Sequence, residues 1–248
     1  MGKVIINANE QKKIGMLTPS SNTVLEPICS NMAYGLEKNV TMHYARFTVT
    51  EISLEEGALK QFNFEPMLQA AKQLADADVD VIAWNGTSGG WLGFDTDREL
   101  CRKITEETGI PSTTSMLAQI EAFEKFNVKK IHMITPYLQA INELIRKEYA
   151  KCGVEVVRDV CLNQSVNRSF SLVPQEKIQN MFSQICGEKA DGISVVCTNF
   201  PAMWSVPVIE ENYGMTVYDT INTVVWQAMK MVDVDPGLVK GWGRLFQL

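Results

Sequence analysis

Two short stretches of this chain decide its fold: KIGMLTP at residues 13–19 and KIHMITP at residues 130–136. Each is an apolar run that ends in Thr-Pro and leads into polar sequence with the pattern of a starting helix, which is typical of a buried strand followed by a helix. The two stretches are identical at five of seven positions. We interpret them as the first strands of two copies of one structural unit.

Two further pairs of segments follow in the same order. DVIAWNGTS at residues 80–88 parallels DGISVVCTN at 191–199, and GIPSTTSMLAQIEAF at 109–123 parallels GMTVYDTINTVVWQAM at 214–229. In the first of these pairs Gly86 aligns with Cys197. Three matches in one order are hard to attribute to chance, so the chain is predicted to contain an internal duplication.

Helical patterns lie between the paired strands, at residues 65–78, 96–109, 137–153 and 174–190. Strands that alternate with helices predict parallel sheets. We therefore expect an α/β fold with two doubly wound parallel-sheet lobes related by a pseudo-twofold axis. The N-terminal lobe would cover residues 1–118 and take back the C-terminal helix within 219–248, and residues 119–218 would form the second lobe. Ligands of such sheets bind at the carboxyl ends of the strands, which places the active site in the cleft between the lobes.

Composition excludes several classes of protein. Of 248 residues, 46% are hydrophobic and 21% are charged, which is typical of a globular protein, and the net charge is −6 without any basic run. A nucleic-acid partner is therefore not expected. No segment has the roughly 20 apolar residues of a membrane span, and MGKVIINANEQKK at residues 1–13 lacks the features of a signal peptide. We expect a cytoplasmic protein without a membrane partner; the apolar tail GWGRLFQL at 241–248 is compatible with a homo-oligomer.

The cysteines are scattered, without a C-x-x-C pair or a neighbouring His. No metal site and no cofactor motif is predicted. Cys197, at the end of the apolar run of DGISVVCTN, is the candidate reactive thiol. The other five are expected to be small buried hydrophobes: Cys29, Cys101, Cys152, Cys161 and Cys186.

Several motifs, in order and spacing, resemble the aspartate/glutamate racemase superfamily, in particular the branch of arylmalonate decarboxylase and maleate cis-trans isomerase. TPSSNT (18–23) resembles the first loop of the isomerases, TPY ending at Tyr137 resembles a carboxylate-binding loop, and VCTN resembles the second active-site cysteine. VNRSFSLVP (166–174) resembles the Asp-Asn substrate segment, with Val166 in place of the Asp. The resemblance implies a cleft site that binds a small carboxylate through Pro19, Asn22, Gly86, Thr87, Ser88, Tyr137, Asn167 and Thr198.

One departure from the pattern bears on the reaction. The racemases and isomerases carry a cysteine at the end of one strand in each lobe, whereas this chain has Gly86 at the first of the two positions. The GTS that begins there resembles arylmalonate decarboxylase, in which Thr and Ser hold a carboxylate and one cysteine protonates the product. Trp84, Trp91, Phe94, Phe200 and Trp204 flank the two strand ends and are either pocket or core.

The favoured hypothesis is a cofactor-independent decarboxylase of a malonate-type dicarboxylic acid, in which Cys197 protonates an enediolate held by hydrogen-bond donors. The first alternative is a maleate cis-trans isomerase, or an amino-acid or dicarboxylate racemase, that uses Cys197 as nucleophile or base. The second is a two-lobed ligand-binding protein without catalysis. The substrate and the oligomeric state are not determined by the sequence.

Overall fold

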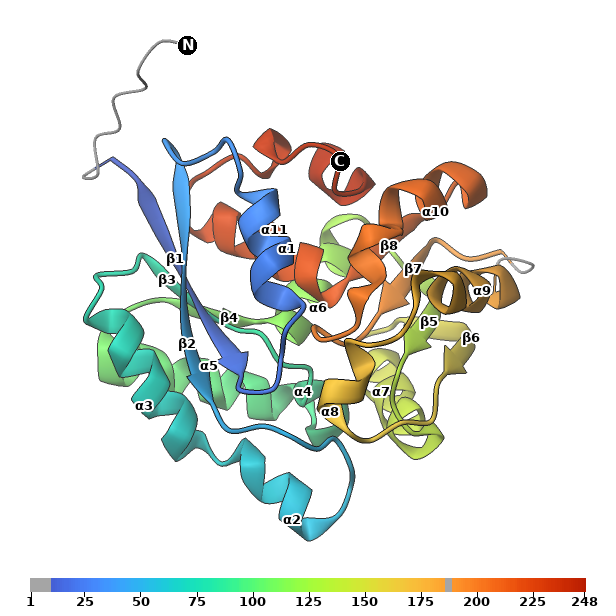
Figure 1. Ribbon diagram of the computed structural model, residues 1–248, viewed down its shortest axis with the longest axis horizontal. Coiled ribbons are helices and arrows are strands. Elements are labelled where there is room, and N and C mark those ends of the chain that lie inside the picture. Colours follow the sequence, from blue (N-terminus) through green and yellow to red (C-terminus); the bar gives the residue numbers. More distant parts are fainter. Residues whose placement is uncertain (1–9, 186–188) are drawn as a thin grey trace.

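A computed structural model describes residues 10–185 and 189–248, and they form two four-stranded parallel sheets (Figure 1). The first sheet has the order β2-β1-β3-β4 and the second the order β6-β5-β7-β8, so the two copies share one topology. The strands are β1 (Lys12–Pro19), β2 (Val40–Phe47), β3 (Val81–Trp84), β4 (Ser112–Thr114), β5 (Lys130–Thr135), β6 (Glu155–Cys161), β7 (Gly192–Val195) and β8 (Thr216–Asp219).

Helices connect the strands as expected of right-handed crossovers. The starts of α3, α6 and α11 are capped by side chains that accept backbone N–H bonds, those of Asn63, Thr114 and Asp219. The α-helices are α1 (Leu25–Met32), α2 (Glu56–Leu59), α3 (Phe64–Ala75), α4 (Gly89–Leu92), α5 (Phe94–Thr108), α6 (Ser115–Lys125), α7 (Gln139–Lys151), α8 (Asn167–Phe170), α9 (Gln175–Ile185), α10 (Val206–Tyr213) and α11 (Thr220–Met231). Short 3₁₀ turns are η1 (Lys60–Phe62), η2 (Pro201–Trp204), η3 (Pro236–Leu238) and η4 (Arg244–Gln247).

The predicted duplication is confirmed by the positions of the matched strands. β1 and β5 pair with two neighbours each, β3 and β7 stand next to them, and β4 and β8 form one edge of each sheet. The opposite edges, β2 and β6, were not predicted, because their side chains are mixed in polarity and only partly buried. The four predicted helices are present as α3, α5, α7 and α9, although residues 186–188 of the last lie outside the described part of the chain.

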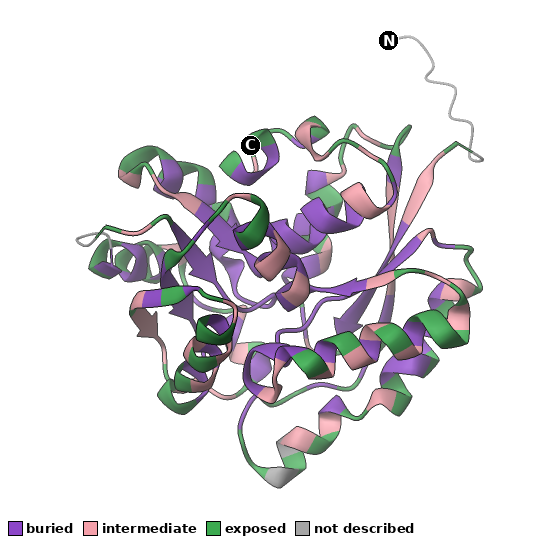
Figure 2. Ribbon diagram, turned by 180° about the vertical axis from the view of Figure 1, so that it is seen from behind, coloured by how far each residue is buried: buried purple, intermediate pink, exposed green. Residues whose placement is uncertain are grey.

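Burial follows this layered architecture (Figure 2). All residues of β3 and β7 are buried, because helices cover both faces of a parallel sheet and leave no polar side. The surface helices bury one stripe each; in α3 this stripe includes Met67, Leu68 and Ala71. The core therefore determines where the strands end, and the strand ends carry the polar residues considered below.

The last helix of each copy crosses towards the other. α6 and α11 pack against one another, and each of them contacts β4 and β8, so strands from both sheets touch the pair. α11 also contacts β3 and α1 of the first copy. This packing is what a return of the C-terminal helix to the first lobe requires, while a lobe boundary near residue 118 stays a prediction.

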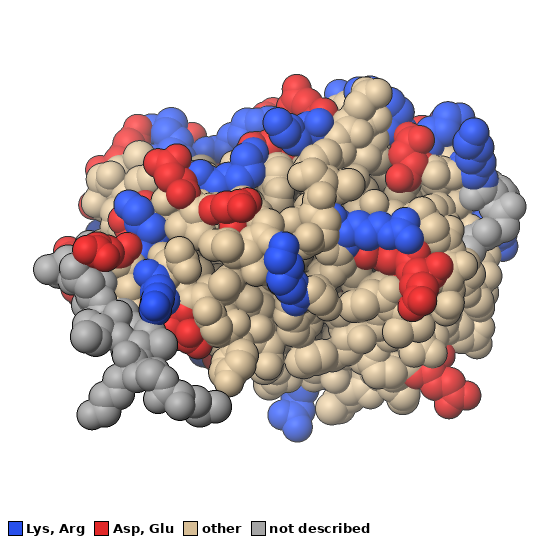
Figure 3. Space-filling view, turned by 90° about the horizontal axis from the view of Figure 1, so that it is seen from above, with Lys and Arg blue, Asp and Glu red and all other residues tan. Residues whose placement is uncertain are grey.

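The face of the molecule in Figure 3 carries charges of both signs. On the face in Figure 3, Lys and Arg side chains lie beside Asp and Glu, and surface ion pairs such as Lys72–Glu107 and Lys130–Glu155 are of this kind. Within residues 10–185 and 189–248, no helix is long and apolar enough to cross a membrane.

Candidate active site

A small cavity of about 20 Å³ lies where the carboxyl ends of strands from both sheets meet. Seven of the residues proposed from the sequence line it: Pro19, Gly86, Thr87, Tyr137, Asn167, Cys197 and Thr198. These positions follow β1, β3, β5, β6 and β7, so the duplication brings residues distant in sequence to one point. Val49, Ile52, Phe62, Trp84 and Trp91 complete the wall.

Cys197 lies two residues after the end of β7, and it is 2% exposed. Burial raises the pKa of its thiol to about 12, although the Tyr137 hydroxyl and the backbone N–H groups of Asn199 and Phe200 act in the opposite direction by hydrogen bonding to the sulfur. At neutral pH the group is therefore a protonated thiol. These same donors would stabilise a thiolate if the proton were given up.

Two hydroxyl groups from different lobes meet beside this thiol. Thr87, after β3, and Tyr137, after β5, share a hydrogen bond of 2.7 Å between Oγ1 and Oη, and Tyr137 also bonds Cys197. Desolvation and the neighbouring thiol raise the pKa of Tyr137 well above its usual value, so the phenol stays neutral and can donate. Thr87, Tyr137 and Cys197 thus form a continuous chain of hydrogen bonds across the junction between the two sheets.

A second chain of hydrogen bonds connects the two lobes next to the cavity. The Thr198 hydroxyl donates to the carbonyl of Asn85 at 2.8 Å and accepts from the Asn22 amide at 3.1 Å. Asn22 is itself engaged at the start of α1, where its Oδ1 accepts from the backbone N–H groups of Val24 and Leu25. Asn22 is buried and is not part of the cavity wall, but its amide contacts Thr198, which is.

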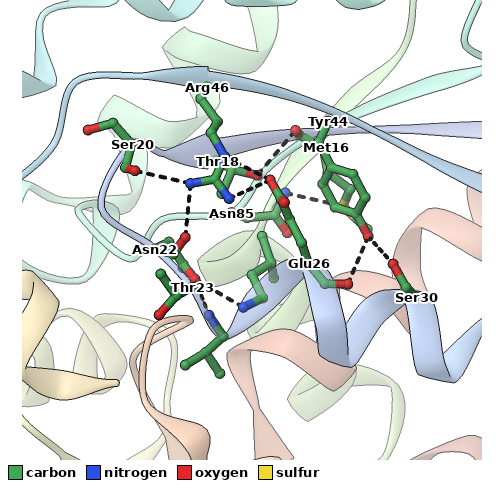
Figure 4. A network of polar contacts seen from close by, with 12 residues as sticks. Met16, Thr18, Ser20, Asn22, Thr23, Glu26, Ser30, Tyr44, Arg46 and Asn85 are labelled. Carbon is green, nitrogen blue, oxygen red and sulfur yellow. Dashed lines mark hydrogen bonds and ion pairs between the residues drawn. The ribbon is translucent and has the colours of Figure 1, made fainter. Parts of the chain in front are cut away.

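The loop that carries Asn22 is held by an arginine (Figure 4). Arg46 on β2 donates to the carbonyls of Ser20 and Asn22, at 3.0 and 2.9 Å, and pairs with Glu26 of α1 at 2.8 Å. Carbonyls in a loop would otherwise need water, and the guanidinium replaces it with a fixed donor fork. The sequence contained no sign of this role, because Arg46 lies in a strand that was not predicted.

Asn167 reaches the cavity from the first residue of α8. Its side-chain amide donates to Ser21 Oγ at 2.7 Å, and its backbone carbonyl accepts from the side-chain amide of Asn199 at 2.8 Å. Asn199 Oδ1 in turn accepts from the Thr23 backbone N–H at 3.0 Å. The TPSSNT loop, the Asn167 segment and the VCTN segment are therefore joined by direct hydrogen bonds.

The remaining residues of the GTS motif have different surroundings. Gly86 is required for space: a Cβ there would stand 2.0 Å from Cζ2 of Trp84. Ser88 is buried at the start of α4 but is not part of the cavity wall, and its carbonyl accepts from Trp91 N and Leu92 N. Thr87 is thus the member of this motif whose hydroxyl reaches the cavity.

Two of the five aromatic residues near the strand ends line the cavity, and three do not. Trp84 and Trp91 belong to the wall. Phe94 packs against Tyr149 in the core, Phe200 is fully buried elsewhere, and Trp204 is 48% exposed and stacks on Trp242. Phe62, which the sequence did not mark, joins Trp91 by an edge contact, with ring centroids 5.9 Å apart.

The other described cysteines lie away from the cavity wall. Cys29 is fully buried on α1, as predicted. Cys101, Cys152 and Cys161 are only half-buried, which differs from the expectation. Cys101 lies on α5, Cys152 directly follows α7, and Cys161 ends the edge strand β6. Cys186 lies outside the described residues. Among the residues the structure describes, no group of His, Cys, Asp and Glu could hold a metal ion.

Comparisons with known proteins agree with this geometry. The family model described as arylmalonate decarboxylase matches residues 39–246, and the chain belongs to this family. A maleate isomerase of Pseudomonas putida is 25% identical over 94% of this chain and 96% of its own length. The arylmalonate decarboxylase of Bordetella bronchiseptica is 23% identical over 73% of this chain and 77% of its own length. Both kinds of relative are enzymes, so the chain belongs to a family of enzymes.

A solved structure shows the same fold. A cysteine-to-serine variant of the maleate cis-trans isomerase of Nocardia farcinica, with a covalently bound succinylcysteine intermediate, aligns with a TM-score of 0.85 over 95% of this chain and 98% of that chain, at 18% identity. The α/β architecture with two parallel sheets and the resemblance to the branch of arylmalonate decarboxylase and maleate isomerase are thereby confirmed.

Proposed function

We propose that this protein is a cofactor-independent decarboxylase of a malonate-type dicarboxylic acid, with Cys197 as the proton donor. The observation that carries the proposal is that Cys197 is the one cysteine among the described residues that lines the cavity, with Gly86 at the corresponding strand end of the other lobe. A single thiol can deliver a proton to one face of an intermediate. It cannot exchange protons on both faces, as a two-thiol racemase does.

The reaction needs only groups of the cavity. The bond from the α-carbon to one carboxylate breaks, CO₂ leaves, and the electron pair moves into an enediolate formed with the remaining carboxylate. The Thr87 and Tyr137 hydroxyls exchange their bonds to one another and to Cys197 for bonds to the enediolate oxygens, and each donor contributes about 3 kcal/mol, as an oxyanion-hole donor does. The Cys197 thiol then gives its proton to the α-carbon, and the resulting thiolate is reprotonated from water.

The protonation state of the thiol supports a donor rather than a nucleophile. Burial raises the pKa of Cys197 to about 12, so nearly all of the group is S–H at neutral pH. A nucleophilic cysteine is normally a thiolate with a lowered pKa.

A maleate cis-trans isomerase is the second candidate. It is favoured by the similarity to maleate isomerases over more than nine-tenths of the chain and by the covalent cysteine intermediate of the Nocardia farcinica enzyme. In that reaction the Cys197 sulfur would add to a carbon of the double bond, the new single bond would rotate, and the sulfur would leave again. This chemistry requires Cys197 to lose its proton before it adds.

The experiment that decides between them is a product assay on purified protein. Malonate, methylmalonate, phenylmalonate and maleate are incubated separately, with CO₂ release and fumarate formation followed by NMR. We expect CO₂ from at least one malonate and less than a hundredth of that rate in Cys197→Ser. Fumarate from maleate without CO₂ from any malonate would overturn the decarboxylase. Cys161→Ser, which changes a thiol outside the cavity, is the matched control and should keep full activity.

A further inference from the structure

Two buried hydrogen-bond donors of the cavity wall have no partner in the protein. The indole N–H groups of Trp84 and Trp91 make no hydrogen bond, although the two side chains are only 0% and 7% exposed. An indole nitrogen only donates, and buried indoles usually find an acceptor because an unpaired buried donor costs free energy. Two such groups on the wall of one small cavity indicate a ligand that brings acceptor atoms.

The position of Trp84 supports this interpretation. Its Cε2 and Cζ2 atoms would stand 2.4 and 2.0 Å from a Cβ on Gly86, and Cε2 is bonded to the indole nitrogen. The six-membered ring of the indole therefore lies against Gly86, where a first-lobe thiol would project into the site, and the nitrogen is bonded to one of the ring atoms in this contact. Phe47 packs on this indole with ring centroids 4.9 Å apart and keeps it in place.

Trp91 belongs to the same group of contacts. Its ring meets Tyr137 edge to face, with centroids 5.4 Å apart, so the indole is adjacent to the hydroxyl pair of Tyr137 and Thr87. Among the residues that the structure describes, no Lys or Arg lines the cavity. An anion in this site would therefore be held by neutral donors alone, and bonds from neutral donors to a carboxylate are strengthened by its charge.

We propose that the indole N–H groups of Trp84 and Trp91 form a second carboxylate-binding pair, beside the hydroxyl pair of Thr87 and Tyr137. The ligand class is then a small dicarboxylate, with one carboxylate at each pair; in this respect the proposal rests on the proposed function. The cavity of about 20 Å³ has room for about one water molecule, so the site widens when the ligand enters. Trp84 also determines stereochemistry, because an indole neither gives nor takes a proton near neutral pH. The face covered by Trp84 is closed to proton transfer, and Cys197 serves the other.

The test uses the five tryptophans of the chain as reporters. The Cys197→Ser protein is labelled with ¹⁵N-tryptophan, its indole signals are assigned by single Trp→Phe variants, and malonate and maleate are titrated separately. With at least one dicarboxylate, the Trp84 and Trp91 N–H protons should move downfield and saturate together. Trp204, Trp226 and Trp242 should not move, because none of them lines the cavity. Absence of binding of both dicarboxylates, or binding seen by calorimetry without these two shifts, would overturn the proposal.

Affinity gives a second measurement. Trp84→Phe and Trp91→Phe keep a six-membered aromatic ring and remove the donor together with the five-membered ring, so each should weaken dicarboxylate binding about tenfold. Trp204→Phe is the matched control and should bind as the parent does. Affinities of both cavity variants within twofold of the parent would contradict the proposal. If a cavity variant does not fold, the signal shifts of the Cys197→Ser protein alone decide.

The outcome is separable from that of the proposed function. Turnover is measured on the unmodified protein, whereas the indole shifts are measured on a variant without the thiol. Shifts without CO₂ release from any malonate would remove the decarboxylase and leave the indole pair standing. CO₂ release from a malonate without indole shifts would support the decarboxylase and overturn the indole pair.

Discussion

Cys197 shows how one residue acquires its chemistry from its surroundings. The side chain itself is a common buried thiol, and the Tyr137 hydroxyl and two backbone N–H groups beside it would stabilise its conjugate base, as the proposed role of proton donor requires. Burial and these hydrogen bonds have opposite effects on its pKa, and burial is the larger. The thiol therefore stays protonated at pH values where an exposed cysteine ionises.

This property predicts an unusual pH dependence of activity. A donor thiol loses function as the pH rises through its own pKa, which burial raises to about 12. We expect no loss of kcat between pH 8 and 9.5, the interval in which an ordinary thiol ionises. The measurement is kcat against pH on the best malonate substrate, with circular dichroism at each pH to exclude unfolding. A falling limb centred between pH 8 and 9.5 would show that the donor has an unperturbed pKa.

At the scale of secondary-structure elements, the strand ends of the two copies have equivalent positions but carry different residues. β7 leads to a thiol, whereas β3 leads to Gly86 and carries Trp84 at its last position. Alternate residues of an extended chain face the same side, so the indole covers the glycine two positions later. The absence of a thiol at position 86 and the presence of the indole at position 84 are thus linked, because the indole occupies the space that a side chain on Gly86 would need.

This arrangement predicts the result of restoring the second thiol. Gly86→Cys alone should lose most activity and lower the melting temperature, because the new Cβ overlaps the Trp84 ring. Gly86→Cys combined with Trp84→Ala provides space and should exchange the α-deuterium of both enantiomers of a chiral product, which NMR detects. Exchange of only one enantiomer in the double variant would argue against two-face chemistry at these strand ends. Trp84→Ala alone is the control for cavity effects.

The start of α11 provides a second prediction at this scale. Asp219 is fully buried, caps the helix through the Ile221 N–H, and has a pKa raised by burial to about 8. Because its unfolded value is near 4, its contribution to stability is present at pH 4 and is lost as the pH rises through about 8. Asp219→Asn keeps a good cap and should flatten this decline.

The measurement is urea unfolding of three proteins at pH 5 and pH 8. The parent should lose more stability between the two values than Asp219→Asn does. Asp219→Ala removes the cap and should cost about 1 kcal/mol relative to Asp219→Asn at both pH values. Equal pH dependence in the parent and in Asp219→Asn would show that this carboxyl group does not titrate in the range.

On the scale of the whole molecule, the site depends on how the two sheets are joined. The Thr198 hydroxyl links Asn85 of the first copy to the second and also receives the Asn22 amide, and all three residues are buried. The hydrogen bonds of Asn199 with Thr23 and with Asn167 stabilise the same junction at a second place. Relative movement of the lobes would separate Thr87 from Tyr137 and open the cavity.

Thr198→Val tests this junction, because valine has the same shape and no hydroxyl. It leaves the Asn85 carbonyl and the Asn22 amide without that partner in a buried place, which should cost about 1–3 kcal/mol in urea unfolding. Turnover should fall as well, since Thr198 follows Cys197 directly. Thr105→Val, where the hydroxyl is exposed, is the control and should change stability by less than about 0.5 kcal/mol. Equal effects of the two substitutions would show that the junction bond does not matter.

Much of this protein follows from local patterns in its chain. The three matched segment pairs predict two parallel sheets of one topology, because apolar runs of strand length and helical periodicity depend only on near neighbours. The alignment of Gly86 with Cys197 also follows from the repeat, and so does the clustering of Thr87, Tyr137 and Cys197 at strand ends. These parts of the prediction needed no knowledge of how the copies pack.

The rest was decided by packing between residues far apart in sequence. Asn22 and Thr198 are 176 positions apart, and only the docking of the two sheets makes them hydrogen-bond partners. The same holds for the edge strands β2 and β6 and for the indoles of Trp84 and Trp91 on the cavity wall. Periodicity specifies which face of an element is buried. It does not specify which distant element buries that face, because this depends on the shape of the assembled core.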